Sequence, residues 1–250
     1  MKHEEMIRIV PGATTAVLFL HGIVGTPNHF VGGVPITEWV PETWSMHNLL
    51  LPGHGKQVED FAKSSMQQWR CAARRAFCRL AKTHERIFIV AHSMGTLFAM
   101  ELAVDFPEKI SGLFLLGVPL RPHVAPSAVN SALRLALGKL RPGRPEMGIL
   151  QACGTTPTWK LWKYIPWLPR FIELFAQIAR TEKKIDRLTV PTIAYQSRKD
   201  ELVNGLSANV LRHYPVEVRI LEGSTHFYYS PEDTKILREA FETLILEEQP

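Results

Sequence analysis

Short apolar runs alternate with amphipathic stretches along most of this chain. Apolar runs that end at glycine, proline or polar residues are typical of strands buried on both faces of a parallel sheet. The pattern predicts six such strands, at residues 16–20, 46–51, 86–91, 111–118, 190–196 and 216–221. Because helical segments separate them, we predict an α/β fold in which helices cover a mostly parallel sheet.

Three longer segments carry apolar residues at helical spacing. The first, residues 64–82, has one apolar stripe formed by Trp69, Ala73, Ala76, Phe77 and Leu80, and its arginines face elsewhere. A second helix is predicted from about Thr96 to Val104, before Pro107, and a third over residues 231–247.

The alternation stops between residues 119 and 185, where prolines are dense and the pattern is helical without intervening strands. This segment is rich in aromatic residues and too apolar for a solvated linker. We therefore predict a core domain made of residues 1–118 and 186–250, with a helical cap of residues 119–185 inserted into it.

The composition is that of a globular protein, with 46% hydrophobic and 21% charged residues among 250. The apolar run nearest the N-terminus, Ala16 to Leu20, is far shorter than the roughly 20 residues of a membrane-spanning helix. Residues 1–8 are charged and lack the apolar stretch of a secretory signal, so we expect a cytoplasmic protein. The three cysteines form no disulfide framework, and no His/Cys cluster has zinc spacing.

The net charge of +5 is unevenly distributed. Residues 119–185 contain eleven Lys and Arg against three Asp and Glu, whereas the remainder of the chain is slightly acidic. This excess favours either an anionic substrate or surface, or simply a solvated face of the protein. No nucleic-acid partner is expected.

A serine stands where the clearest predicted strand meets the helix that follows it, within residues 91–95, Ala-His-Ser-Met-Gly. A nucleophilic serine must expose its hydroxyl on a tight strand-to-helix turn, and small residues two positions away let strand and helix approach closely. Gly95 meets this need, and Ala91 stands where glycine is usual. We predict that Ser93 is a nucleophile; a serine that only caps the helix is the alternative.

A serine nucleophile needs a base, and the base needs an acid that orients it. Asp200 follows the strand that is predicted to end near Gln196, and His226 follows the strand that is predicted to end near Leu221. Both positions are carboxyl ends of strands, where open parallel sheets place their sites. We predict that Asp200 is the acid and His226 the base. Rival acids are Glu201, Glu222, Asp105 and Asp186, and rival bases are His92, His54 and His213.

The tetrahedral intermediate of acyl transfer also needs hydrogen-bond donors for its oxyanion. One is expected to be the backbone N–H of Met94, the residue after the nucleophile. The other is expected from the loop that follows the first buried strand, through the N–H of Ile23, although His21-Gly22 also fits an ordinary strand-ending turn.

Taken together, these residues resemble the α/β-hydrolase superfamily. The segments that carry the resemblance occur in the family's order: residues 20–22 (Leu-His-Gly), 51–55 (Leu-Pro-Gly-His-Gly), 91–95, Asp200 and 223–226 (Gly-Ser-Thr-His). The likeness is greatest to the carboxylesterase and monoacylglycerol-lipase branch, which inserts a small cap where residues 119–185 fall. It implies an α/β-hydrolase fold with an eight-stranded, mostly parallel sheet and helices on both faces, to which residues 7–10 would add a strand.

The resemblance implies a serine carboxylesterase or monoacylglycerol-lipase-like hydrolase that cleaves small-molecule esters of short to medium acyl chains through an acyl-enzyme on Ser93. A thioesterase or a carbon–carbon bond hydrolase with the same triad is the alternative, followed by a non-catalytic binding protein on the same fold. No metal or organic cofactor is required for this chemistry.

The tryptophans of the cap have three interpretations. They line a substrate pocket, since ligand sites are largely apolar, or they only pack the cap onto the body. In the third interpretation they form a weak membrane-surface patch with neighbouring cations. The residues concerned are Trp159, Trp162 and Trp167, with Lys160, Lys163 and Arg170.

Overall fold

A computed structural model describes residues 3–126, 128, 149, 152 and 160–246. Its centre is one sheet of seven strands in the order β1-β3-β2-β4-β5-β6-β7. All neighbouring strands are parallel except β1, which pairs with β3 in the antiparallel direction. The strands are β1 (Met6–Arg8), β2 (Thr15–Leu20), β3 (Ser45–Leu49), β4 (Arg86–His92), β5 (Ile110–Leu116), β6 (Thr192–Ser197) and β7 (Glu217–Leu221).

The strand pattern is confirmed for all six predicted runs, and residues 6–8 add the antiparallel strand at the edge. The expected number of eight strands is wrong for the part of the chain that the structure describes, which forms seven. The sheet ends at β1 because this strand has only three residues and is largely exposed, as an edge strand is, and no other described segment pairs with its outer side.

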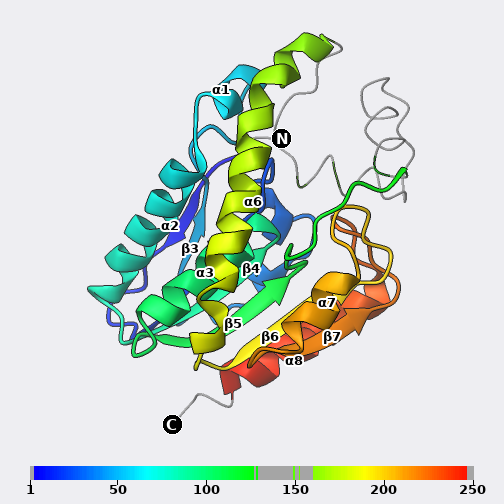
Figure 1. Ribbon diagram of the computed structural model, residues 1–250. Coiled ribbons are helices and arrows are strands. Elements are labelled where there is room, and N and C mark those ends of the chain that lie inside the picture. The colour runs from blue at the N-terminus through cyan, green and yellow to red at the C-terminus, as the bar shows by residue number, and fades with distance from the viewer. Residues whose placement is uncertain (1–2, 127, 129–148, 150–151, 153–159, 247–250) are drawn as a thin grey trace.

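Helices cover both faces of the sheet (Figure 1). On one face lie α2 (Met66–Ala81), α3 (Met94–Asp105), α6 (Leu168–Glu182) and α7 (Leu206–Leu211), and on the other lies α8 (Pro231–Leu246). The short helix α1 (Val58–Ala62) contacts η3 (Leu161–Trp167), the turn of helix that leads into α6. The predicted helices at 64–82, 96–104 and 231–247 correspond to α2, α3 and α8.

The two cores follow from the alternation of side chains along each buried strand. In β2, Leu18 and Leu20 belong to the core beneath α2 and α3, whereas Val17 and Phe19 belong to the core beneath α8. Every residue of β2 is buried, as the continuous apolar run predicts. The apolar stripe predicted for α2 is buried against the first of these cores.

The C-terminal half of α6 packs tightly against α3 and the core beneath it. Leu174 and Ile178 enter the same core as α3. The buried carboxylate of Glu101 on α3 accepts hydrogen bonds from Gln177, Arg180 and Thr181, with distances of 2.8–3.2 Å. A domain boundary at residue 185 stays a prediction.

The chain after β5 runs beside the loop that follows β6. The backbone N–H of His123 donates to the carbonyl of Leu202, that of Ala125 to Glu201, and that of Asn204 to Arg121, each at 2.9 Å. Residues 121–125 and 201–204 therefore pair over a short length in the antiparallel direction at the carboxyl edge of the sheet. None of the described helices is long and apolar enough to span a membrane.

Candidate active site

Ser93 occupies a strained turn between β4 and α3. Its backbone has φ +51° and ψ −125°, a conformation that residues with side chains rarely adopt. The Ser93 N–H donates to the carbonyl of Leu116 on the neighbouring strand at 2.8 Å, which holds the turn in place. Such a turn lifts the side chain above the end of the sheet, as a nucleophilic serine requires.

Two glycines allow neighbouring backbone segments to approach this turn closely. A Cβ atom on Gly95 would collide with the carbonyl oxygens of Leu20 and His21, so α3 begins directly against the end of β2. A Cβ atom on Gly22 would lie 2.7 Å from the Cβ of Ser93. Gly22 therefore brings the loop after β2 beside the serine, and the position of Ala91 tolerates its methyl group in the fully buried strand.

Asp200 and His226 come together at the same edge of the sheet, from the loops after β6 and β7. The Nδ1–H of His226 donates to Oδ2 of Asp200 at 2.8 Å, and both side chains are about 2% exposed. The other carboxylate oxygen of Asp200 accepts the backbone N–H groups of Leu202 and Val203 at 2.8 and 2.7 Å. The aspartate is thus fixed in place, and Nε2 of His226 is left as the proton acceptor.

The charge around His226 favours its protonated form. Burial of the imidazole disfavours the cation, but the charge and hydrogen bond of Asp200, with the charge of Glu201, outweigh burial and raise the pKa of His226 above its ordinary value. This is the environment that a general base needs in order to take a proton and hold it as an imidazolium.

The alternative acids lie elsewhere or act differently. Glu201 is buried and accepts the backbone N–H of His226 at 3.1 Å, so it holds the main chain of His226 and not the ring. Glu222 pairs with Arg198 at the surface. Asp105 pairs with Arg74 and Lys184, and Asp186 is exposed in η4 (Ile185–Arg187).

The alternative bases are also accounted for. His92 donates from Nε2 to the carbonyl oxygen of His226 at 3.0 Å, and its ring stacks on His29 with centroids 3.8 Å apart. Burial lowers the pKa of both rings, that of His29 to about 3. His54 packs against Phe61 and Trp69, and His213 is bonded to a carbonyl at the exposed end of α7. The stacked pair was not predicted, because residues 29 and 92 are brought together only by the fold.

The expected oxyanion donors flank Ser93. Met94 begins α3, so its N–H is one of those that have no partner within the helix. Ile23 lies in the loop after β2, which His21 braces: Nδ1–H of His21 donates to the Gly22 carbonyl at 2.9 Å, and Nε2 accepts the N–H of Leu51 at 3.0 Å. Burial lowers the pKa of His21 to about 4, consistent with a neutral ring in this bridge.

A cavity of about 460 Å³ opens at these residues. Apart from Ser93, His226 and His123, its described lining is apolar: Ile23, Val24, Pro119, Pro122, Val124, Phe171, Leu174, Phe175, Leu202, Val203 and Phe227. Among the described residues, no group of three or more His, Cys, Asp or Glu side chains is placed to hold a metal ion.

The structure does not bring the predicted tryptophans to the described part of this cavity. Trp167 is buried, packs on Phe61 with centroids 4.4 Å apart and donates to the carbonyl of Val58 at 2.8 Å. Trp162 is 58% exposed, and Trp159 lies outside the described residues. The phenylalanines of its described wall are instead Phe171 and Phe175, one and two helical turns after Trp167, and Phe227.

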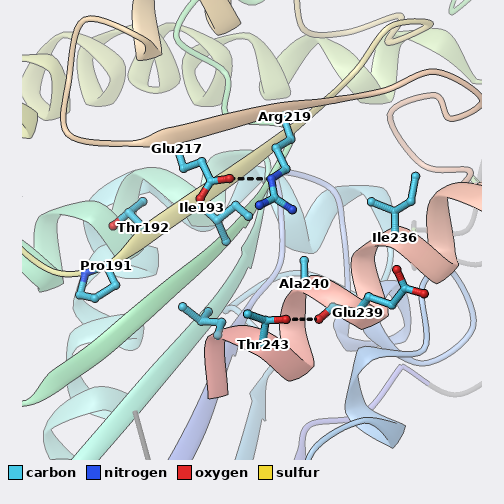
Figure 2. A pocket seen from close by; sticks show the side chains of 10 residues that line it. Pro191, Thr192, Ile193, Glu217, Arg219, Ile236, Glu239, Ala240 and Thr243 are labelled. Atoms are coloured by element: carbon cyan, nitrogen blue, oxygen red, sulfur yellow. Dashed lines mark hydrogen bonds and ion pairs between the residues drawn. The ribbon is translucent and has the colours of Figure 1, made fainter. Parts of the chain in front are cut away.

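A second crevice, of about 540 Å³, lies between β6, β7 and α8 (Figure 2). It contains none of the predicted catalytic residues. Its ionic groups are Glu239 and the pair Glu217 and Arg219, which are bonded to each other at 2.6 Å. Its described lining contains no pair of groups comparable to Ser93 and His226 of the first cavity.

Comparison with known proteins identifies the family to which the chain belongs. Residues 15–158 match the family described as the alpha/beta hydrolase fold. A thermostable monoacylglycerol lipase from Bacillus sp. (strain H-257) is 24% identical in an alignment of length 207 that covers 78% of this chain and 74% of that protein.

Solved structures with similar folds include a protein from a study of the metagenome-derived lipolytic enzymes LipS and LipT (TM-score 0.71, 21% identity, 98% of each chain covered). The monoacylglycerol lipase of Paleococcus ferrophilus has a TM-score of 0.65 at 16% identity, over 99% of this chain and 100% of that one. Est1E from Butyrivibrio proteoclasticus, solved with ferulic acid, has a TM-score of 0.64 at 17% identity, over 98% and 94%.

Proposed function

Since this chain belongs to the alpha/beta hydrolase fold family, we propose that it is a serine ester hydrolase of the carboxylesterase and monoacylglycerol-lipase type. The observation that carries the proposal is the bonded pair Asp200–His226, whose histidine lines the same apolar cavity as Ser93 on its strained turn. The lipolytic relatives support an ester as the substrate.

The reaction follows from these positions. His226 Nε2 takes the proton of Ser93 as the serine oxygen attacks the ester carbonyl, while Asp200 holds the ring and stabilises the imidazolium. The N–H groups of Ile23 and Met94 bind the oxyanion, and each is expected to lower the barrier by about 3 kcal/mol. His226 then protonates the leaving alcohol, and water releases the acid from the acyl-enzyme.

We expect the substrate to carry an acyl chain of short to medium length. Its volume of about 460 Å³ lies in the range of small-molecule sites, and Phe171, Leu174 and Phe175 give it an apolar wall. A thioesterase or a carbon–carbon bond hydrolase would use the same triad. Turnover of aryl esters, monoglycerides and acyl thioesters separates these reactions, and negligible ester turnover beside fast thioester turnover would reject the ester assignment.

The decisive test of the mechanism is Ser93→Ala. We expect kcat/KM for a soluble aryl ester to fall about 10⁴-fold or more, and labelling by a fluorophosphonate probe to disappear, with the thermal unfolding midpoint unchanged within a few degrees. Absence of labelling in the folded wild-type protein would show that the fold serves another purpose, such as ligand binding.

We further propose that the cap contacts lipid surfaces through the outer side of η3 and α6. Large apolar side chains are exposed there at helical spacing: Trp162, Ile165, Leu168, Phe171, Ile172 and Phe175. Two of them, Phe171 and Phe175, also line the cavity, so the apolar surface continues into its mouth. A second copy of the chain on this surface would cover that mouth, whereas a lipid aggregate would deliver substrate to it.

Anionic lipid is not needed for this contact. Lys163 pairs with Glu59, and Arg170 is bonded to Glu173 and to the carbonyls of Ala62 and Ser64, so both cations are engaged within the protein. We expect co-sedimentation with phosphatidylcholine vesicles that persists as salt is raised. The double variant Leu168→Asp/Ile172→Asp should lose it, while Ile236→Asp on α8 should not; equal binding of all three proteins would overturn the proposal.

A further inference from the structure

The main chain of His226 is held on both of its polar groups by buried side chains. Its N–H donates to the carboxylate of Glu201 at 3.1 Å, and its carbonyl oxygen accepts the Nε2–H of His92 at 3.0 Å. Both side chains are buried, so the two bonds are shielded from bulk water. Because this stretch of backbone carries the imidazole of His226, the two bonds help to decide where its Nε2 lies.

His92 reaches His226 from the strand that leads to the nucleophile. It is the last residue of β4, and Ser93 follows it directly. The rings of His92 and His226 lie with their centroids 4.6 Å apart. The side chain of His92 therefore connects the strand that carries Ser93 to the loop that carries the base.

Another edge of the His92 ring faces the loop of the expected oxyanion donor Ile23. A Cβ atom on Gly22 would lie 3.2 Å from Nδ1 of His92 and 3.3 Å from Oγ of Ser93, so the missing side chain of Gly22 leaves room for both. The ring thus lies between the loop after β2 and the loop after β7. It is close to all three parts of the proposed site: the nucleophile, the base and the oxyanion loop.

The surroundings keep this ring neutral. Burial, and then the neighbouring rings of His29 and His226, hold the pKa of His92 well below its ordinary value. A carbonyl oxygen can only accept a hydrogen bond, so the neutral ring carries its proton on Nε2. A neutral donor suits this place, because a second cation beside His226 would oppose the imidazolium that forms during acyl transfer.

We propose that His92 is a positioning residue whose bond from Nε2–H to the carbonyl of His226 sets the reach of the catalytic base toward Ser93, an inference that rests on the proposed ester hydrolysis. His92 is not among the described residues that line the cavity, so it acts through His226 and not on the substrate. Without this bond the loop of His226 can shift, and proton transfer is sensitive to a displacement of about 1 Å. The effect is therefore expected on kcat and not on KM.

Two amide variants test the hydrogen bond while they keep a polar side chain. The amide nitrogen of glutamine corresponds to Nε2 of an imidazole, whereas that of asparagine corresponds to Nδ1. His92→Gln should keep kcat for a soluble aryl ester within about fivefold of the wild type. His92→Asn should lower kcat about 10- to 100-fold, with KM within about twofold of the wild-type value. The rate of fluorophosphonate labelling should fall in parallel with kcat.

A merely structural role would lower both variants alike. We therefore measure the thermal unfolding midpoint of each variant, which should agree within a few degrees, and express kcat per site that the probe labels at saturation. With these two measurements, a partly unfolded preparation cannot imitate a slow enzyme.

His29→Phe separates the hydrogen bond from the stacking. His29 stacks on His92 with centroids 3.8 Å apart, and neither of its ring nitrogens has a partner among the described residues. A phenyl ring keeps this stacking, so kcat should stay within about threefold of the wild type. Equal kcat in His92→Gln and His92→Asn, or a loss in His29→Phe as large as in His92→Asn, would overturn the inference. A folded wild type that neither reacts with the probe nor cleaves esters would instead overturn the proposed function, so the two failures are distinguishable.

Discussion

At the carboxyl edge of the sheet, the groups that hold Asp200, His226 and the loop of Ile23 are bonded within the protein, whereas both ring nitrogens of His29, which stacks on His92, have no partner among the described residues. Both oxygens of Asp200 are bonded, as are both ring nitrogens of His21 and the backbone N–H of His226. In the wall contributed by the residues after β5, Nδ1 of His123 has no partner among the described residues, and Phe171 and Phe175 are exposed. The loops after β6 and β7 thus hold the proposed reacting groups in place in advance, whereas the wall after β5 leaves its binding capacity open for a ligand.

The largest effect on activity is expected from a change at Asp200, whose hydrogen bonds hold the carboxyl edge of the sheet. In Asp200→Asn the ring of His226 loses its charged partner and its favoured tautomer, and kcat/KM should fall about 10³- to 10⁴-fold. Glu201→Gln is the matched control, because the amide oxygen can still accept the N–H of His226; its loss should stay below about tenfold. Reversed effects in steady-state assays would make Glu201 the catalytic acid.

The close packing around Ser93 allows a test of stability at the same carboxyl edge of the sheet. Gly95→Ala would press a methyl group into the carbonyls of Leu20 and His21. We expect the free energy of unfolding, measured by urea denaturation, to fall by about 3 kcal/mol. Gly205→Ala, where a Cβ would meet no atom within 4 Å, should change it by less than about 1 kcal/mol. A neutral Gly95→Ala would mean that the turn is not tightly packed.

A milder effect is expected from a change in the cavity wall to which Phe171 contributes. Phe171→Ala removes apolar surface from the cavity, so kcat/KM for octanoate esters should fall about tenfold while that for acetate esters stays within about twofold. Ile236→Ala, in the crevice beside α8, serves as the control and should alter neither. A uniform loss on both esters would indicate that Phe171 positions the triad and does not bind the acyl chain.

The smallest expected effect is on the pH profile. Catalysis needs neutral His226, and its pKa is raised, so kcat/KM should rise with pH through a midpoint above 6.5. Burial opposes this shift, while Asp200 and then Glu201 produce it. Glu201→Gln should therefore move the midpoint slightly downward without a large loss of rate. An unchanged midpoint would show that the charge of Glu201 does not reach the ring.

Much of the fold and of the candidate site could be predicted from local patterns. The apolar runs of β2 and β4 are buried along their length and read as strands, and the small residue at position 95 is needed within two positions of Ser93. The positions of Asp200 and His226 followed because parallel strands present their carboxyl ends at one edge. The number of strands and the cavity role of the tryptophans did not follow, since both depend on which segments meet in space.

The sequence by itself predicted the kind of chemistry: a nucleophile, an acid and a base, each placed by a short pattern of neighbouring residues. Only the tertiary structure decided that Glu201 holds the main chain of His226, that His29 stacks on His92, and that Trp167 is turned inward while Phe171 lines the cavity. The physical reason is the distance along the chain over which each effect acts. Strand and turn propensities act over a few residues, whereas these contacts join segments up to more than a hundred residues apart and depend on how side chains pack.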